Sequence, residues 1–111
     1  TQIAEKIYSS LASPPTLNLK IGVITVSDRA HNDEYPDGDQ SGPAVVQALS
    51  DYLKIPHETP PTIIVPDDIP QIHNAIQTHI ATSSCTTILL TGGTGYAPRD
   101  VTPEAVSSYE R

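Results

Sequence analysis

The chain has 111 residues, which is enough for one domain, and its 13 acidic against six basic residues give a formal charge of −7. The basic residues never form a run, so a nucleic-acid partner is not expected, and no apolar stretch approaches the length of a membrane span. No signal peptide is visible, so we expect a cytoplasmic protein. An acidic protein that binds phosphates needs positive charge from elsewhere, and a divalent cation held by carboxylates would supply it.

Strands and helices alternate along the chain, which is the pattern of an α/β layer fold. Residues 1–18 are predicted to form a short helix and a Pro-rich linker, and residues 19–111 one domain. Leu19–Val26 is almost continuously apolar, which predicts a central parallel strand buried on both faces. A polar loop over residues 29–42 is followed by a helix for which Ser41 is the predicted cap.

The second half of the chain continues the alternation. A short strand over residues 62–65 precedes isoleucines at steps of three and four, which predict a helix with Pro70 in its first turn. The third strand is expected over residues 86–90, and Cys85 before it is interpreted as a small hydrophobic residue. Thr102 is the predicted N-cap of a last helix that begins with Pro103.

Polar residues follow each of the three predicted strands. They are Ser27 and Asp28 after the first strand, Asp67 and Asp68 after the second, and a glycine loop with Arg99 and Asp100 after the third. If the strands are parallel neighbours, these residues converge at the sheet edge where ligands bind in such folds. Glycines at 92, 93 and 95 allow consecutive N–H groups to face an anion. The residues alone therefore predict phosphoryl or nucleotidyl transfer, with phosphates and Mg²⁺ held in position.

Each of these residues also has a purely structural explanation. The glycine turn can serve its shape alone, one aspartate of the Asp67 pair can cap the next helix, and Asp28 can close an Asx-turn. The acidic residues from 33 to 39 can form a solvated loop, and Arg99 with Asp100 a surface ion pair. The four histidines fit no ligand spacing, so no metal is assigned to them.

Four sequence blocks resemble, in order and spacing, the molybdopterin adenylyltransferase family. They are residues 21–28, 39–43, 65–68 and 91–105. The family includes bacterial single-domain enzymes and the G domains of gephyrin-like and plant molybdenum-cofactor proteins. The resemblance implies a molybdopterin-binding α/β fold with a mostly parallel sheet, helices on both faces, and assembly into a homotrimer.

The resemblance also implies a reaction and a partner. Such enzymes use Mg²⁺ and ATP to transfer AMP to the terminal phosphate of molybdopterin, and they release pyrophosphate. An insertase domain, fused or separate, then loads molybdate. Asp67 and Asp100 match the family's catalytic aspartates and are expected to hold Mg²⁺, directly or through water. Nucleotide or phosphate binding is expected of Ser27, Asp28, Asp39, Ser41, Gly92, Gly93, Thr94, Gly95 and Arg99.

The sequence departs from the family pattern in places. Asp68 replaces a glutamate, Gln40 replaces the arginine of gephyrin-like proteins, and the family continues beyond Arg111. We therefore expect a domain that is incomplete at its C-terminus and is itself weakly active or inactive. Two alternatives are a non-catalytic trimeric scaffold and a nucleotide pyrophosphatase or insertase domain of related fold. Two strand-end carboxylates favour an enzyme over a scaffold, and residues 102–105 favour the adenylyltransferase.

Overall fold

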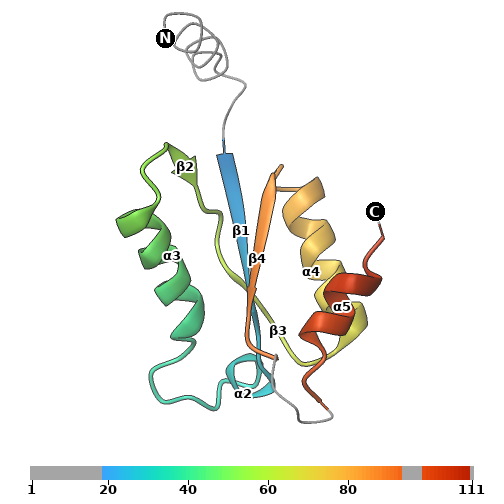
Figure 1. Cartoon of the computed structure of the whole chain (residues 1–111). Coiled ribbons are helices and arrows are strands. Elements are labelled where there is room, and N and C mark those ends of the chain that lie inside the picture. The colour runs from blue at the N-terminus through green and yellow to red at the C-terminus, as the bar shows by residue number, and fades with distance from the viewer. Residues whose placement is uncertain (1–18, 94–98, 111) are drawn as a thin grey trace, which may run out of the picture.

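The sheet is parallel throughout and is built around its first strand (Figure 1). The computed structural model describes residues 19–93 and 99–110. In it, β1 (Leu19–Val26) pairs in parallel with β2 (His57–Glu58), β3 (Ile63–Val65) and β4 (Thr87–Thr91). The predicted central strand is confirmed with its bounds. The helix and linker predicted for residues 1–18, and Thr94 and Gly95 of the glycine loop, lie outside the described residues.

The strand register brings the carboxyl ends of three strands to one edge. Val26 of β1 lies opposite Val65 of β3, and Thr25 lies opposite Thr91 of β4. The segments that follow these strands therefore start side by side. This is the convergence that the sequence predicts only if the strands are neighbours.

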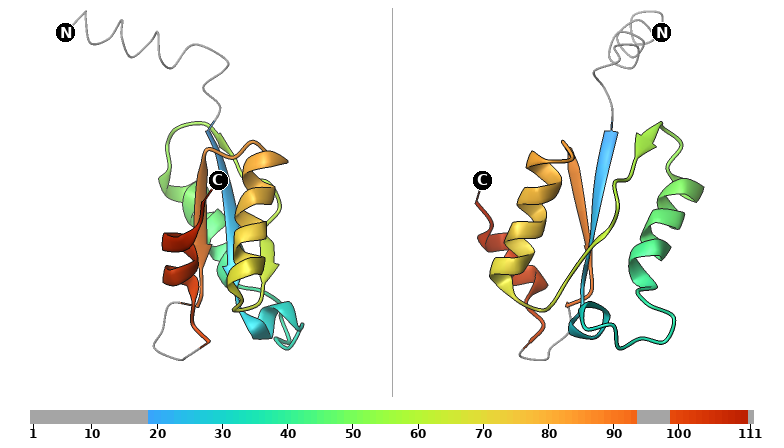
Figure 2. Two further views of the ribbon diagram at one scale, coloured as in Figure 1. Left: turned by 90° about the vertical axis from the view of Figure 1, so that its right-hand side faces the viewer. Right: turned by 180° about the vertical axis from the view of Figure 1, so that it is seen from behind.

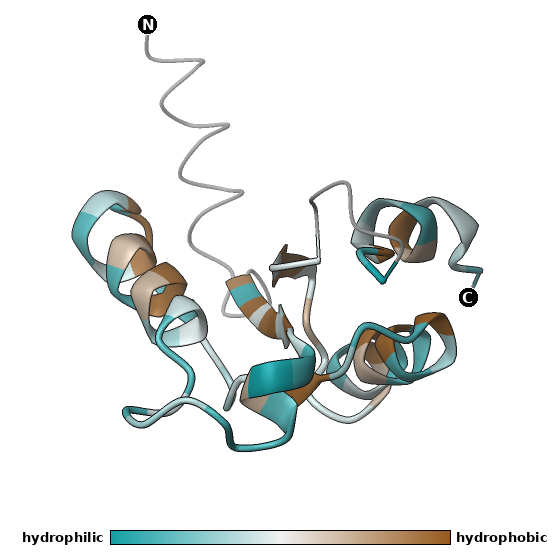
Figure 3. Ribbon diagram, turned by 90° about the horizontal axis from the view of Figure 1, so that it is seen from below, coloured by the Kyte–Doolittle hydropathy of each residue, from teal (hydrophilic) through white to brown (hydrophobic). Residues whose placement is uncertain are grey.

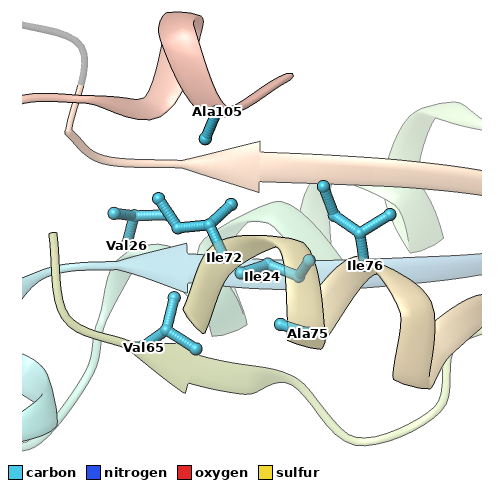
Figure 4. Close-up of a cluster of buried hydrophobic side chains, with 7 residues drawn as sticks. All are labelled: Ile24, Val26, Val65, Ile72, Ala75, Ile76 and Ala105. Atoms are coloured by element: carbon cyan, nitrogen blue, oxygen red, sulfur yellow. The ribbon is translucent and has the colours of Figure 1, made fainter. Parts of the chain in front are cut away.

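Helices cover both faces of the sheet, as expected for this fold class (Figures 2 and 3). One face carries α3 (Ser41–Tyr52), and the other carries α4 (Ile69–Ala81) and α5 (Thr102–Ser108). Figure 4 shows the buried apolar cluster between the sheet, α4 and α5. Its members are Ile24, Val26, Val65, Ile72, Ala75, Ile76 and Ala105. No helix in the described part of the chain is long and apolar enough to cross a membrane.

Two short elements were not predicted. The loop expected over residues 29–42 overlaps a one-turn helix, α2 (Asp28–His31), which begins where Ser27 Oγ accepts a hydrogen bond from the Ala30 N–H at 3.2 Å. The other element is β2, which has only two residues. Elements this short show no periodicity in a sequence, because a hydrophobic pattern needs several residues to repeat.

Two predicted caps are wrong and one is confirmed. Ser41 is the first residue of α3, and Asp39 Oδ1 accepts from the Gly42 N–H at 3.3 Å instead. Thr102 lies inside α5, and its hydroxyl donates to the Gly92 carbonyl at 2.7 Å. Of the two adjacent aspartates, Asp68 caps α4 by accepting from the Gln71 N–H at 3.1 Å. Asp67 is therefore left for another role.

Candidate functional site

A cavity of about 550 Å³ opens at the carboxyl edge of the sheet. Among the sequence-predicted site residues, it is lined by Ser27, Asp39, Ser41, Asp67, Gly92, Gly93 and Asp100. Asp28 and Arg99 do not line it, and they lie beside it in contact with each other. The structure thus brings together residues that are spread over 74 positions of the chain, from Ser27 to Asp100.

Asp67 has an unusual environment for a carboxylate. Its Oδ2 accepts from the Asp28 N–H at 3.3 Å, whereas its Oδ1 is buried and has no hydrogen-bond partner in the described part of the chain. Burial raises the pKa of Asp67, and the negative charges of Asp28 and Asp100 act in the same direction, while the hydrogen bond from Asp28 opposes them. A cation or a proton at Oδ1 would relieve this cost.

Gly93 leaves the space beside that oxygen. A Cβ at position 93 would lie 2.8 Å from Asp67 Oδ1 and would clash with Thr102 Oγ1, and the residue has a φ of +64°. Gly92 has a φ of +91°, and a Cβ there would clash with the Val26 carbonyl. Both glycines are therefore required by shape, and the same shape lets the backbone approach Asp67 closely.

Thr102 fixes the far end of the glycine loop. Its hydroxyl donates to the Gly92 carbonyl, and its N–H donates to the Gly93 carbonyl at 3.0 Å. The start of α5 is thereby attached to the glycine turn. The sequence identified Thr102 as an important position but predicted that its hydroxyl accepts from an N–H of its own helix, whereas the hydroxyl donates to Gly92.

Asp39 organises the opposite wall of the cavity. Its Oδ2 accepts from the Thr25 hydroxyl at 2.8 Å, and its Oδ1 accepts from the Ser41 hydroxyl and the Gly42 N–H, each at 3.3 Å. Thr25 is 1% exposed and was missed by the sequence analysis. The sequence feature that could have identified Thr25 is its hydroxyl group in a mostly apolar strand.

Asp28 and Arg99 form an ion pair. Arg99 Nη2 donates to Asp28 Oδ1 at 2.9 Å, and Arg99 Nε donates to Asp28 Oδ2. These hydrogen bonds lower the pKa of Asp28 to about 2. The alternative of an Arg99–Asp100 surface pair is wrong in its partner, and in place of an Asx-turn the Asp28 side chain accepts from Arg99 and from the Asp67 N–H.

The segment from Tyr35 to Gly38 also lines the cavity, although the sequence suggested a solvated loop. The Arg29 guanidinium lies 4.7 Å from the centroid of the Tyr35 ring, which holds this aromatic side chain at the rim. The sequence feature that could have identified this segment as part of the site is the aromatic Tyr35 among acidic residues.

Two of the histidines, both on α4, donate hydrogen bonds to neighbouring elements. His79 Nε2 donates to the Val23 carbonyl at 3.0 Å, and His73 Nε2 donates to the Ala105 carbonyl at 2.8 Å. Within residues 19–93 and 99–110, no three His, Cys, Asp or Glu side chains are grouped so that they could hold a metal by themselves. Asp67 and Asp100 line the same cavity, and Mg²⁺ in proteins is commonly held by one or two carboxylates completed by phosphate oxygens and water.

Fold and site together define a parallel α/β domain with an acidic cavity, bounded by a glycine turn, at the carboxyl edge of its sheet. The family described as "Probable molybdopterin binding domain" matches residues 22–110. The chain belongs to this family, so the resemblance noted from the sequence is confirmed.

Individual relatives agree. The chain is 39% identical over 87 residues to molybdopterin adenylyltransferase of Escherichia coli K12, which covers 78% of this chain and 43% of that protein. It is 45% identical over 85 residues to the molybdenum cofactor biosynthesis bifunctional protein of Synechococcus elongatus, covering 77% and 25%. The crystal structure of the molybdopterin biosynthesis enzyme MoaB from Thermus thermophilus superimposes with a TM-score of 0.70 at 34% identity, covering 80% and 53%. The chain thus spans about half the length of these relatives, or less.

Proposed function

We propose that the protein containing this chain is a molybdopterin adenylyltransferase that transfers AMP from ATP to the terminal phosphate of molybdopterin and releases pyrophosphate. The observation that carries the proposal is the buried, unpartnered Oδ1 of Asp67 beside the glycine turn, with Asp100 on the same cavity. The names of the relatives support the substrates.

The carboxylates and the glycine turn of the cavity have separate roles in the proposed reaction. Asp67 and Asp100 would hold Mg²⁺, directly or through water, and the ion would supply positive charge to neutralise phosphate charge as it develops during transfer. The N–H groups of the Gly92–Gly93 turn, which lines the cavity, would donate to phosphate oxygens. An oxygen of the molybdopterin phosphate attacks the α-phosphorus of ATP, the bond to the β-phosphate oxygen breaks, and pyrophosphate leaves. Preorganised groups of this kind act without a covalent enzyme intermediate.

The wider setting of the reaction follows from the resemblance and from the relatives. A bifunctional relative supports a partner insertase domain, fused or separate, that consumes the adenylylated product. We also propose that the protein assembles as a homotrimer and acts in the cytoplasm.

The test is an assay of the full-length protein with molybdopterin, ATP and Mg²⁺ that measures both AMP transfer and pyrophosphate. Asp67→Asn and Asp100→Asn should each lower kcat about 100-fold or more, as expected for removal of a preorganised charged group. Asp68→Asn is the matched control, because Asp68 caps α4 and does not line the cavity. It should keep kcat close to that of the wild type.

The outcomes separate the alternatives. Normal AMP transfer by Asp100→Asn would exclude the role proposed for that residue. Pyrophosphate release without AMP transfer would indicate a nucleotide pyrophosphatase. A wild-type protein that forms trimers and binds partners but releases no pyrophosphate would be a scaffold.

A further inference from the structure

Asp28 contacts both sides of the candidate site without lining its cavity. Its Oδ1 accepts from the Asp67 N–H at 3.0 Å, and its own N–H donates to Asp67 Oδ2 at 3.3 Å. Its carboxylate also binds Arg99 through both oxygens. One residue thus links the end of β1 to the end of β3 and to the segment that follows the glycine loop.

We propose that Asp28 is a positioning residue that fixes Asp67 and Arg99 relative to each other and does not itself bind the nucleotide. The proposal rests on the proposed function and gives Asp28 a different role from the nucleotide or phosphate binding expected from the sequence. It also pairs Arg99 with Asp28 when no substrate is bound.

The hydrogen bonds of Asp28 leave it poorly suited to a phosphate. Both of its carboxylate oxygens already accept hydrogen bonds, and its charge is balanced by the Arg99 guanidinium. A carboxylate also repels a phosphate unless a cation lies between them. The Arg99 guanidinium therefore stabilises the negative charge of Asp28, and this charge requires no contact with the nucleotide.

The same contacts hold one proposed catalytic aspartate, Asp67, and the residue next to the other, Asp100. At Asp67, the backbone N–H donates to Asp28 Oδ1 and Oδ2 accepts from the Asp28 N–H, so both are held while the unpartnered Oδ1 remains available. On the other side, Asp28 holds the side chain of Arg99, the residue that precedes Asp100 in the chain. A displacement of about 1 Å in a reacting group can cost about 100-fold in rate, so this linkage is expected to matter for turnover.

The decisive variant is Asp28→Asn in the full-length protein. Asparagine keeps an oxygen that can accept from the Asp67 N–H, but it has no negative charge, and its N–H₂ group replaces an oxygen that accepts from Arg99. We expect kcat to fall about ten-fold or more while the KM for ATP stays within about two-fold, because an interaction that positions catalytic groups affects the transition state. A rise in KM with unchanged kcat would show that Asp28 binds nucleotide and would overturn the proposal.

Asp51→Asn is the matched control. Asp51 is an exposed aspartate on α3 that accepts from Gln47 and lies outside the cavity. This control should leave kcat and KM unchanged. The thermal midpoint of Asp28→Asn should fall only slightly, because an ion pair with a largely exposed arginine makes a small contribution to stability.

A double-mutant cycle tests the linkage to Arg99. Arg99→Gln should lower kcat as Asp28→Asn does, and the double variant should lose no more than either single variant, because both remove the same interaction. Losses that multiply would mean that the two residues act independently, which would contradict the proposal. Arg99→Lys should recover only part of the activity, because lysine lacks the two-pronged guanidinium.

A spectroscopic signature makes the proposal independent of turnover. In the wild type without substrate, NMR should show a slowly exchanging Arg99 Nε–H and a protected Asp67 amide. Asp28→Asn should remove the Arg99 signal, and Asp28→Ala should also expose the Asp67 amide. If the wild type shows no AMP transfer, the proposed function fails while this linkage can still hold. An Arg99 signal that Asp28→Asn leaves unchanged would overturn the linkage itself.

Discussion

Arg99 holds the carboxyl group of Asp28 ionised at unusually low pH. We expect a carboxyl NMR titration to give a pKa of about 2 for Asp28, and Arg99→Gln to return it toward 3.8. Because the folded-state pKa is lower than the unfolded one, the stabilisation is complete above about pH 4 and is lost as the pH falls toward 2. Urea midpoints should therefore fall more steeply over this range in the wild type than in Arg99→Gln. Parallel curves would contradict the ion pair.

Asp67 has a pKa shift of the opposite sign, with burial as its main cause. Its folded-state pKa is higher than the unfolded value of 3.8, so its charge opposes folding, and stability falls as the pH rises past that value. We expect the change in thermal midpoint caused by Asp67→Asn to be more favourable at pH 7 than at pH 3. Comparing the two pH values cancels any effect of the amide itself. An equal change at both would show that the carboxylate is not strained by burial.

Gly93 and Gly38 allow backbone strain to be separated from steric conflict. Both have positive φ, +64° and +75°, but a Cβ at Gly38 meets nothing within 4 Å, whereas at Gly93 it would meet Asp67 and Thr102. Gly38→Ala should cost about 1–2 kcal/mol of unfolding free energy from the backbone alone. Gly93→Ala should cost about 1–3 kcal/mol more because of overpacking. Equal costs in urea titrations would mean that the turn can move away from Asp67.

The sequence predicted the members of the site better than their contacts. Asp67 and the glycine turn could be identified because polar residues at the ends of parallel strands follow a general rule. The partner of Arg99 could not, because Asp28 is 71 positions away and only the folded chain brings them together. The caps at Ser41 and Thr102 were wrong for a related reason. At the start of α3, Asp39 accepts from the Gly42 N–H, and at the start of α5, Thr102 donates to the Gly92 carbonyl. A pattern of residue types does not show which of several nearby groups makes a given hydrogen bond.

At the scale of the elements, β1 and α4 pack closely where His79 lies against Gly22. A Cβ at Gly22 would lie 2.6 Å from His79 Cγ, so the imidazole occupies the space that glycine leaves. We expect Gly22→Ala to cost about 3 kcal/mol of unfolding free energy, at the upper end for overpacking. The added methyl group has no other direction in which to move within a buried strand.

The second-site variant His79→Ala tests that explanation. Alone it removes a buried side chain and its hydrogen bond to Val23, so it should also destabilise the fold. Combined with Gly22→Ala, it makes room for the methyl group, and the double variant should lose less than the sum of the two. Additive losses would show that the conflict with His79 does not limit this position.

Length decided which elements the sequence could reveal. The eight residues of β1 and the 13 of α4 repeat their apolar pattern often enough to be recognised. The short helix α2 depends on a local side-chain cap, and β2 depends on pairing with Leu19 and Lys20. Neither contact produces a periodic pattern in the sequence.

At the scale of the whole molecule, the two faces of the sheet are covered unequally. On one face, α4 buries Ile72, Ala75, Ile76 and His79, and α5 packs beside it. On the other face, α3 buries only Gly42, and an apolar groove of about 390 Å³ lies between it and β4. The groove is lined by Val45, Ala48, Leu49, Tyr52, Leu53 and Leu89.

This asymmetry predicts a difference in local stability within the 111-residue chain. Local opening costs least where few apolar contacts are buried, so the amides of α3 should exchange at least about ten-fold faster than those of α4 under native conditions. The Asp39 contacts at the start of α3 should slow exchange in its first turn, which leaves the end near Tyr52 as the fastest part. Hydrogen exchange measured by NMR would resolve this gradient. Equal protection of α3 and α4 would require a partner on the groove, and protection that rises with protein concentration would identify that partner as a second copy of the chain.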